Sequence, residues 1–305
     1  MPLLDSLTRA ELRQRLRHGE LVLRTGPFAT RIRSDIGALA ETIAGMYGAH
    51  VVEPPDSFAD FQVNLLRSRG WRRWFRPQVR FDHDGEAPFT PLPLAQAFPM
   101  LEWVMNWCVS NHAHSYLMLH AAVVEKNGCA IILPAPPGSG KSTLCAALAM
   151  RGWRLLSDEL ALVRCGDGQL TPLARPVSLK NASIDVMRAF APDGRFTTPV
   201  GGTIKGIVGH VRPPDESVAR AAEPARPAWV VFPRFEAGAA TSLAHISKTD
   251  TFMRLIDNAF NYPILGQQGF EVLARLVDGC EGADFVYSRL DEAIALFDGL
   301  AEGAP

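Results

Sequence analysis

Short apolar runs separated by turn residues fill the first third of the chain and predict a small α/β unit. Gly26-Pro27 separates two of these runs, so a turn between two strands is expected there. Ser34 is predicted to cap a helix whose apolar residues recur at helical spacing. The predicted elements are strands at 21–24, 29–32, 61–66 and 79–82, a helix carrying Ile36, Leu39, Ile43 and Met46, and a helix over 98–112.

After residue 117 the apolar runs lengthen and predict a second, larger sheet. The runs 117–124 and 129–133 meet at Asn127-Gly128, a dipeptide typical of tight hairpins because both residues accept positive φ. The second strand should therefore pair antiparallel with the first, which favours a mixed sheet over a wholly parallel one. Further strands at 229–232 and 285–287 and a helix at 291–300 complete a second domain over 113–305, which follows an N-terminal α/β domain over 1–112.

Composition narrows the functional classes. With 47% apolar and 21% charged residues, this 305-residue chain is expected to fold around a sizeable core. A net charge of −1 argues against nucleic acid or an anionic membrane as a partner. The chain has no apolar run near the ~18 residues of a membrane span. Its five scattered cysteines lack ligand or disulfide-framework spacing, so a cytoplasmic protein with reduced thiols is expected.

Residues 135–142 read Ala-Pro-Pro-Gly-Ser-Gly-Lys-Ser, the P-loop pattern with Ala135 in place of its first glycine. Its glycines let backbone N–H groups converge on phosphate oxygens at a helix N-terminus. Lys141 would meet the outer phosphates, and the Ser142 hydroxyl would ligate Mg²⁺. Because an apolar strand precedes the loop and a helix-prone segment follows it, we expect ATP and Mg²⁺ as cofactors. The predicted nucleotide-binding residues are Pro137, Gly138, Ser139, Gly140, Lys141, Ser142 and Thr143.

Two carboxylates, Asp158 and Glu159, end the apolar run that follows the predicted loop and helix. A kinase needs acidic groups beside the metal-bound triphosphate and a base for the acceptor hydroxyl. Asp158, Glu159 and Ser142 are thus candidate metal ligands, and Asp158 is also a candidate base. Neighbours in a regular strand point to opposite faces, so both carboxylates reach one site only if the strand breaks there. The alternative is a solvated strand end. His120, taken alone, is more typical of a core histidine.

Three segments together resemble the kinase core of bacterial HPr kinase/phosphorylase, and more closely the HprK-related kinases of the A type. They are Leu-His-Ala-Ala-Val-Val (119–124), Pro-Pro-Gly-Ser-Gly-Lys-Ser-Thr (136–143) and Arg-Gly-Trp-Arg-Leu-Leu-Ser-Asp-Glu (151–159). The resemblance covers about residues 117–180 and implies the mixed-sheet P-loop fold of phosphoenolpyruvate carboxykinase type. It also implies Asp158 as general base towards a serine hydroxyl, Glu159 in place of a metal-associated aspartate, and His120 beside the phosphates, so that Asp158, His120 and Lys141 are the catalytic candidates.

Departures from that family limit what the resemblance carries over. The parent signature Leu-Glu-Val-Arg-Gly-Leu-Gly is absent, and its nearest counterpart is residues 176–181. Because that segment bears on the parent's phosphorylase activity, we do not expect this activity here. Residues 1–112 do not resemble the parent's N-terminal domain, so the parent's substrate cannot be inherited. The related kinases suggest a peptide or small carrier protein as acceptor, and the parent family suggests a homo-oligomer.

A glycine-rich stretch at 201–212 contains Lys205, His210 and Arg212 and is a candidate to fold over phosphates. Kinases need additional cations for the charge on the transferring phosphoryl group, and Arg175 and Lys180 are further candidates. The alternative for each is a surface charge. Lys205 or Arg212 is our choice. Ser247-Lys248-Thr249-Asp250 is similar to a guanine-reading motif, but without its companion Asp-x-x-Gly it is interpreted as a helix N-cap.

Six arginines and the aromatic residues Trp71, Trp74 and Phe75 alternate between Arg67 and Arg80. Such interleaving can bind single-stranded nucleic acid, but a hairpin tip whose arginines stack on its tryptophans explains the pattern as well. Beside a kinase core, docking of an acidic peptide is preferred to nucleic acid.

The sequence thus predicts a Mg-ATP-dependent serine kinase-like phosphotransferase acting on a Ser or Thr hydroxyl of a peptide or small protein. Two alternatives stay open. One is a kinase of a free small molecule such as an amino acid, which would need a deep closed pocket at Asp158 rather than an open groove. The other is a nucleotide-dependent switch without an acceptor, which would hydrolyse ATP slowly and bind its partner according to the nucleotide state.

Overall fold

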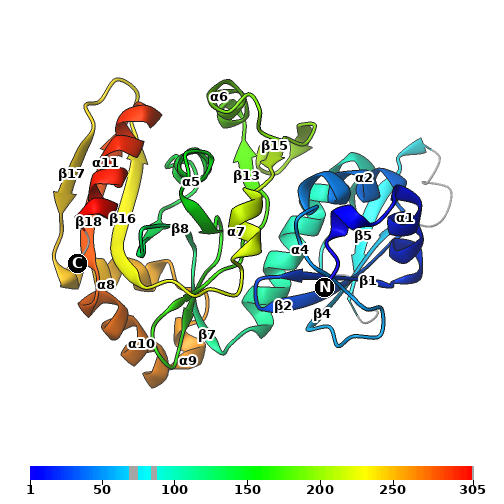
Figure 1. Ribbon diagram of the computed structural model, residues 1–305, viewed down its shortest axis with the longest axis horizontal. Coiled ribbons are helices and arrows are strands. Elements are labelled where there is room, and N and C mark those ends of the chain that lie inside the picture. The colour runs from blue at the N-terminus through cyan, green and yellow to red at the C-terminus, as the bar shows by residue number, and fades with distance from the viewer. Residues whose placement is uncertain (69–74, 84–87, 304–305) are drawn as a thin grey trace.

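The computed structural model describes residues 1–68, 75–83 and 88–303, and these form two α/β units side by side. Helix α4 (Ala97–His112) runs along the face of the N-terminal unit that looks towards the second unit (Figure 1). The C-terminus lies in the second unit, on the side away from the N-terminal unit. Both units therefore meet along α4 and the segments that face it.

The N-terminal unit is built on a mixed sheet with strand order β3-β1-β2-β4-β5-β6. β2 and β4 are parallel, whereas the remaining pairs are antiparallel. The strands and helices expected from the sequence in this unit are present. Its elements are η1 (Leu4–Ser6), α1 (Arg9–His18), β1 (Leu21–Thr25), β2 (Phe28–Ser34), α2 (Gly37–Met46), β3 (Val52–Glu53), β4 (Phe61–Arg67), β5 (Gln78–Asp82), β6 (Leu92–Pro93), η2 (Leu94–Gln96) and α4.

Two helix starts differ from the sequence-based expectation. Helix α1 was not predicted, although Thr8 and Glu11 form a reciprocal capping box: the Thr8 hydroxyl accepts the Glu11 N–H at 3.2 Å, and Glu11 accepts the Thr8 N–H at 2.8 Å. The predicted N-cap role of Ser34 is wrong. Its hydroxyl accepts the N–H of Ile36 at 3.2 Å, so it stabilises a turn that precedes α2 rather than the helix end.

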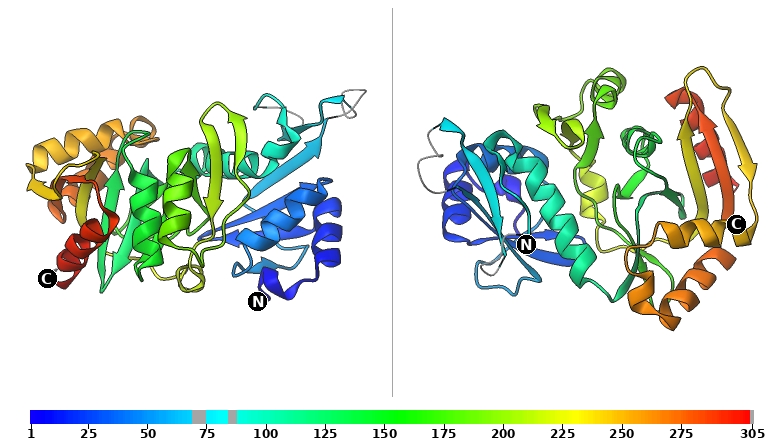
Figure 2. Two further views of the ribbon diagram at one scale, coloured as in Figure 1. Left: turned by 90° about the horizontal axis from the view of Figure 1, so that it is seen from above. Right: turned by 180° about the vertical axis from the view of Figure 1, so that it is seen from behind.

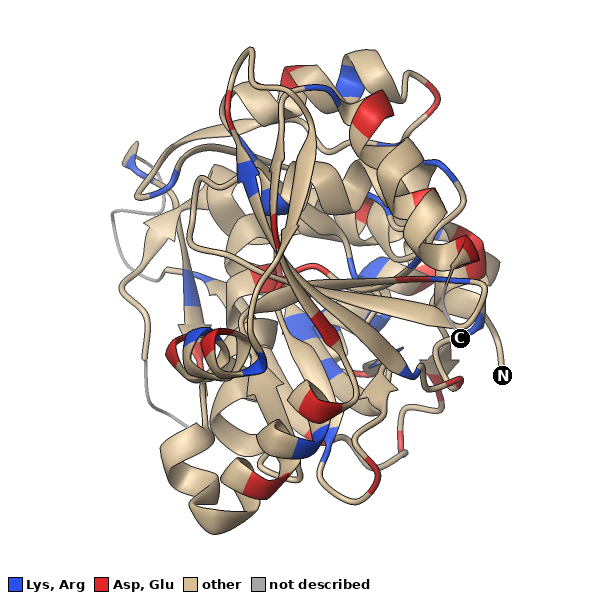
Figure 3. Cartoon of the chain, turned by 90° about the vertical axis from the view of Figure 1, so that its left-hand side faces the viewer, with Lys and Arg blue, Asp and Glu red and all other residues tan. Residues whose placement is uncertain are grey.

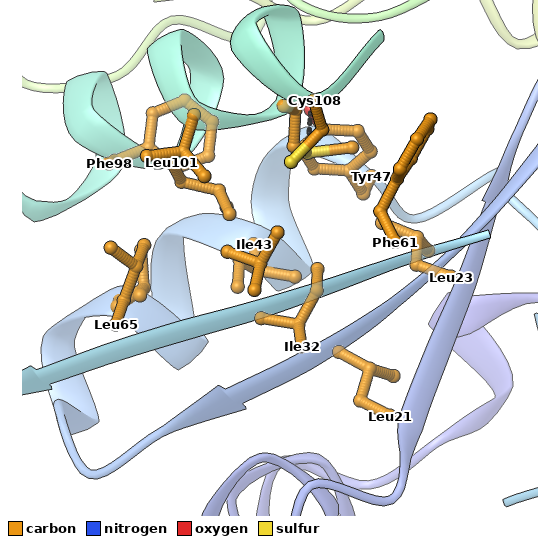
Figure 4. Close-up of a cluster of buried hydrophobic side chains, with 14 of the residues drawn as sticks. Leu21, Leu23, Ile32, Ile43, Tyr47, Phe61, Leu65, Phe98, Leu101 and Cys108 are labelled. Atoms are coloured by element: carbon orange, nitrogen blue, oxygen red, sulfur yellow. Dashed lines mark hydrogen bonds between the residues drawn. The ribbon is translucent and has the colours of Figure 1, made fainter. Parts of the chain in front are cut away.

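The core of the N-terminal unit lies between its sheet and the helices α2 and α4. Figure 4 shows Leu21, Ile32 and Leu65 of the sheet beneath Phe98 and Leu101 of α4. The same buried cluster continues into the second unit through Met118, Leu160, Leu162 and Leu173. Within the proline-rich stretch before α4, β6 pairs with β5, so this part is an ordered crossing rather than a free linker. Shared apolar burial of this kind opposes independent movement of the two units.

The second unit carries the larger mixed sheet, in the order β10-β8-β9-β16-β18-β17. β9, β16 and β18 are parallel, and the other pairs are antiparallel. The Asn-Gly hairpin is confirmed: β8 and β9 pair antiparallel across Asn127 (φ 54°) and Gly128 (φ 79°). Two three-stranded sheets, β12-β11-β7 and β13-β15-β14, accompany the main sheet. The chain is therefore a mixed α/β protein with mixed sheets, as the sequence predicted.

The elements of the second unit follow α4 in chain order. They are β7 (Tyr116–Leu119), β8 (Ala121–Lys126), β9 (Cys129–Pro134), α5 (Lys141–Met150), β10 (Arg154–Ser157), β11 (Ala161–Arg164), β12 (Leu170–Thr171), β13 (Val177–Lys180), α6 (Ala182–Phe190), β14 (Val200–Thr203), β15 (Gly206–Val211), α7 (Asp215–Ala219), β16 (Pro227–Phe235), β17 (Ser242–His245), α8 (Lys248–Asp257), α9 (Tyr262–Leu265), α10 (Gln267–Asp278), β18 (Glu281–Tyr287) and α11 (Leu290–Glu302). The Ser247 side chain accepts the N–H of Asp250 and caps α8, which confirms the helix-start interpretation.

The apolar run 117–124 is not one strand, because it breaks at His120. β7, before the break, pairs with β11, whereas β8, after it, pairs with β10. The chain between β10 and β11 breaks in turn at residues 158–160. The chain thus passes twice between the same two sheets, once from β7 to β8 and once from β10 to β11. Each passage interrupts the strand. This brings His120 and the acidic pair to the same point.

Neither the distribution of charged residues nor the length of the helices indicates a particular class of partner. Figure 3 shows acidic and basic residues mixed over the same elements, in keeping with the net charge of −1. Within the ranges given above, the helices are all too short or too polar to cross a membrane. Of the basic-aromatic stretch between Arg67 and Arg80, residues 69–74 lie outside the described residues, so docking of a partner there stays a prediction.

Candidate functional site

The glycine loop, residues 135–140, joins the end of β9 to the start of α5. Gly138 and Gly140 adopt φ values of 89° and 88°, a region that side chains other than glycine rarely enter. A Cβ at position 140 would also lie 2.5 Å from the Tyr287 hydroxyl. That hydroxyl donates to the Gly140 carbonyl at 3.0 Å, and the Phe235 N–H donates to the Ser139 carbonyl at 2.8 Å. The two neighbouring parallel strands therefore hold the loop in shape.

Lys141 is the first residue of α5, and its side chain is buried. The residue is only 7% exposed, and its Nζ has no hydrogen-bond partner among the described residues. A buried ammonium without a partner is costly, because its solvation is lost and nothing replaces it. An anion at the loop would offset this cost. The buried Nζ, the glycine loop and the helix N-terminus together fit a phosphate group.

Asp158 follows the last residue of β10 and is 6% exposed. Its Oδ2 accepts the N–H of Ser178 at 3.2 Å, whereas its Oδ1 has no partner within the described ranges. Burial, and then the charge of Glu159, raise the pKa of Asp158; the Lys141 ammonium and the Ser142 hydroxyl oppose the rise. Asp158 is thereby a stronger proton acceptor than an exposed aspartate.

Glu159 has a different environment from its neighbour. Burial alone would raise its pKa, but a hydrogen bond with His120 and the charges of Lys141 and Lys180 hold that pKa well below the ordinary range. His120 Nε2 lies 3.1 Å from Glu159 Oε2, and the imidazole also contacts the Phe260 ring. His120 is partly exposed at the strand break, so the core-histidine alternative is wrong. The strand break brings both carboxylates to the same site, as the kinase interpretation requires.

Two cavities adjoin these groups. One, of about 460 Å³, lies beside the glycine loop and is lined by Pro136, Ser139, Phe232, Arg254 and Asn258 among others. The second, of about 20 Å³, lies at the carboxylates and has room for little more than one water molecule. A narrow space at Asp158 does not fit a free small molecule enclosed there.

Helix α4 forms one wall of the smaller cavity. This contribution of the helix to the site was not identified from the sequence. Glu102, Trp103 and Asn106 line it together with Asp158 and Glu159. The Asn106 side chain accepts a hydrogen bond from Arg175, and Glu102 accepts one from the Tyr47 hydroxyl. No local pattern could have identified this wall, because periodicity shows that a helix has a buried face but not what covers that face.

Of the weaker cationic candidates in the glycine-rich stretch, Lys205 lies beside the cavity, whereas Arg212 and His210 are held by other contacts. Lys205, at the tip of the β14–β15 hairpin, places its ammonium 5.3 Å from the Trp103 ring centroid, beside the cavity. Arg212 instead contacts Asp215 at 2.8 Å and Asp5 at 3.3 Å, and so connects the two units. His210 is 1% exposed and packs against Phe98. The prediction of Arg212 as a phosphate-site cation is therefore wrong, because aspartates already occupy its guanidinium.

The predicted metal ligands are compatible with Mg²⁺ bound to a nucleotide. Among the described residues, no three His, Cys, Asp or Glu side chains converge as a metal site. Nucleotide-bound Mg²⁺ does not require such a cage, because phosphate oxygens and water supply most of its ligands and one or two carboxylates suffice. Ser142 lies close enough to Asp158 to lower its pKa, and Glu159 is the adjacent residue. Ser142, Asp158 and Glu159 therefore fit the ion.

Comparison with known proteins gives limited matches. A family model of the SynChlorMet cassette protein ScmC matches residues 95–177, a segment that spans α4, the glycine loop and the acidic pair. No curated protein matches the chain. Among solved structures, the chain is similar to the Hpr(Ser) kinase/phosphatase from Coxiella burnetii, with 12% identity over 61% of this chain and 93% of that one. The TM-score is 0.29.

Proposed function

We propose that this protein is a Mg-ATP-dependent kinase that transfers the γ-phosphoryl group to a Ser or Thr hydroxyl of a peptide or small protein. One observation carries the proposal. A buried, unpartnered ammonium on Lys141 and a buried, unpartnered carboxylate oxygen on Asp158 lie close enough for the lysine charge to act on the pKa of the aspartate. The Lys141 ammonium needs an anion, and the Asp158 carboxylate needs a proton or a cation. Phosphoryl transfer to a hydroxyl requires both a cation at the phosphate and an acceptor for the hydroxyl proton.

The loop and its flanking residues would bind the nucleotide. The backbone N–H groups of residues 138–143 would surround the phosphates, Lys141 would supply positive charge, and Ser142 and Glu159 would hold Mg²⁺. The cavity of about 460 Å³ beside the loop is large enough for the nucleoside. Bound Mg-ATP supplies the transferable phosphoryl group and the cation that neutralises its charge.

Asp158 would accept the proton of the acceptor hydroxyl. Its pKa is raised by burial and by Glu159, whereas His120 and two lysines keep Glu159 ionised. A raised pKa suits a base, and a lowered pKa suits a permanent metal ligand, so the neighbouring carboxylates take different roles. The His120 candidate thus serves Glu159 through a hydrogen bond rather than acting on the substrate itself.

The narrow space at Asp158 supports an acceptor that projects a single side chain into the site from outside. A free amino acid enclosed at the carboxylates would need several times the roughly 20 Å³ found there. The small-molecule kinase and the switch without an acceptor are the two rivals of this proposal.

One experiment separates the kinase from the switch. The purified protein is incubated with Mg²⁺ and γ-labelled ATP, and with either a library of Ser- and Thr-containing peptides or free serine and threonine. Label on peptides, lost in Asp158→Asn but kept in the surface variant Asp167→Asn, is the expected result. Label on the free amino acids alone would favour the small-molecule kinase. Slow phosphate release with no labelled acceptor would favour the switch.

A further inference from the structure

We propose that Trp103, on helix α4 of the N-terminal unit, positions Lys205 against the transferring phosphoryl group, so that the N-terminal unit completes the phosphoryl-transfer site. This inference rests on the proposed kinase function. It assigns Trp103 as a positioning residue, which acts through Lys205 rather than on the substrate.

The hairpin formed by β14 and β15 presents Lys205 at its tip on a tightly held turn. The Thr203 hydroxyl donates to the Gly206 carbonyl at 2.8 Å and accepts the Lys205 N–H at 3.0 Å. On the outer side, Asn181 accepts the Ile207 N–H at 3.0 Å through its Oδ1. Gly206, at φ 85°, leaves no room for a side chain, because a Cβ would lie 2.4 Å from that same oxygen. The turn therefore fixes the backbone from which Lys205 projects.

The N-terminal unit contacts this hairpin at two points, one at Gln96 immediately before α4 and one at Trp103 on α4. Gln96 donates a hydrogen bond from its side chain to the Gly201 carbonyl at 3.2 Å. The Lys205 ammonium lies over the Trp103 ring, 5.3 Å from its centroid. Figure 2 shows the hairpin running beside α4 between the two units. Trp103 in turn lines the cavity that contains Asp158 and Glu159, so it connects the lysine to the reacting groups.

The contact with an aromatic face leaves Lys205 free to bind an anion. None of the ion pairs in the described part of the chain involves Lys205, whereas a carboxylate partner would neutralise the ammonium and use its donors. A ring face attracts the cation without accepting its hydrogen bonds, so the three N–H groups stay available for phosphoryl oxygens.

The surrounding charges favour an anion at this point. Burial lowers the pKa of Lys205; Glu159 opposes this, and Lys180 and Lys141 lower it further. The ammonium groups of Lys180 and Lys141 therefore act against that of Lys205. A transferring phosphoryl group is the ligand in the proposed reaction that would offset the repulsion among them.

The test compares nucleotides that differ in the phosphoryl group facing Lys205. Affinities for Mg²⁺ complexes of ADP and of the imido analogue of ATP are measured by calorimetry for Lys205→Met, Trp103→Leu, Trp103→Phe and the Lys205→Met/Trp103→Leu double variant. Lys205→Met should lose about tenfold in affinity for the triphosphate and little for ADP, because a charged hydrogen bond to the third phosphate is removed. Trp103→Leu should lose part of that factor. Trp103→Phe should restore most of it, and the double variant should match Lys205→Met.

A matched control is the Lys126–Trp153 pair, whose ammonium-to-ring distance of 5.8 Å is similar and which lies away from the loop. Lys126→Met should leave the ratio of triphosphate to diphosphate affinity unchanged. A wild-type ratio in Trp103→Leu, or additive losses in the double variant, would overturn the positioning role.

A second readout keeps this inference separate from the kinase proposal. If Lys141→Ala binds ATP as the wild type does, the kinase proposal fails, and the hairpin contact is then judged by amide hydrogen exchange over residues 201–207. Faster exchange there in Trp103→Leu, with unchanged exchange in β18, supports the contact. Unchanged exchange in the hairpin contradicts it.

Discussion

His120 Nε2 lies 3.1 Å from Oε2 of Glu159, and this hydrogen bond differentiates the two neighbouring carboxylates. Glu159 has its pKa lowered by His120 and by the lysine charges, while burial raises the pKa of Asp158. One residue of the pair is therefore suited to holding a cation and the other to accepting a proton.

Lys141→Ala should weaken ATP binding strongly without unfolding the protein. The variant removes a buried ammonium that has no partner among the described residues, so the melting temperature should stay the same or rise. Affinity for Mg-ATP, measured by calorimetry, should fall by about 100-fold, because a charged contact to the outer phosphates is lost. Lys126→Ala serves as the control. Wild-type affinity in Lys141→Ala would end the nucleotide-loop assignment.

Asp158→Asn should bind Mg-ATP but transfer phosphate about 10² to 10⁴ times more slowly. The substitution keeps the size and shape of the side chain while removing its ability to take a proton. Rates are measured with the best peptide acceptor at several Mg²⁺ concentrations. If Asp158 is chiefly a metal ligand, transfer recovers as Mg²⁺ is raised. A mutant with the normal rate would exclude Asp158 from the mechanism and leave Glu159 as the next candidate.

His120→Gln should raise the Mg²⁺ concentration needed for half-maximal activity by about tenfold, the usual effect of losing a group that orients a metal ligand. The expected change lies in the Mg²⁺ dependence, with little change in the rate at saturating Mg²⁺. His245→Gln is a matched control, since His245 is a surface histidine 3.9 Å from Glu281. Loss of rate that excess Mg²⁺ cannot restore would show that His120 acts on the substrate instead.

Two buried histidines should make the protein less stable as pH falls below about 6.5. Burial lowers the pKa of His50 to about 4 and that of His210 to about 3, from an ordinary value of 6.5. Below pH 6.5 the unfolded chain binds protons that the folded chain does not, so each histidine costs about 1.4 kcal/mol of unfolding free energy per pH unit.

His210→Phe is the variant that isolates one of these contributions. Neither ring nitrogen of His210 has a partner within the described residues, so the substitution removes the titration without breaking a hydrogen bond. Between pH 6 and 4 the unfolding free energy of the variant, from urea titrations, should fall less steeply than that of the wild type by about 1.4 kcal/mol per unit. Parallel curves would show that His210 titrates normally.

Features that depend on a few adjacent residues could be read from the sequence. The turn at Asn127-Gly128 and the glycine loop before Lys141 are encoded locally, because positive φ at asparagine and glycine constrains the chain wherever it lies. The capping box of Thr8 and Glu11 was equally local and could have been recognised. The acidic pair could be identified as a candidate, together with the condition that its strand must break there.

Features that join distant segments required the tertiary structure. The break at His120 arises because β7 and β8 pair with strands of different sheets, which no run of apolar residues reveals. Arg212 resembled a phosphate ligand until the fold brought Asp5 to it. Trp103 was an apolar position on a helix until the fold brought Lys205 over its ring. A side chain's role depends on what packs against it, and for these residues the partners come from segments far away in the chain.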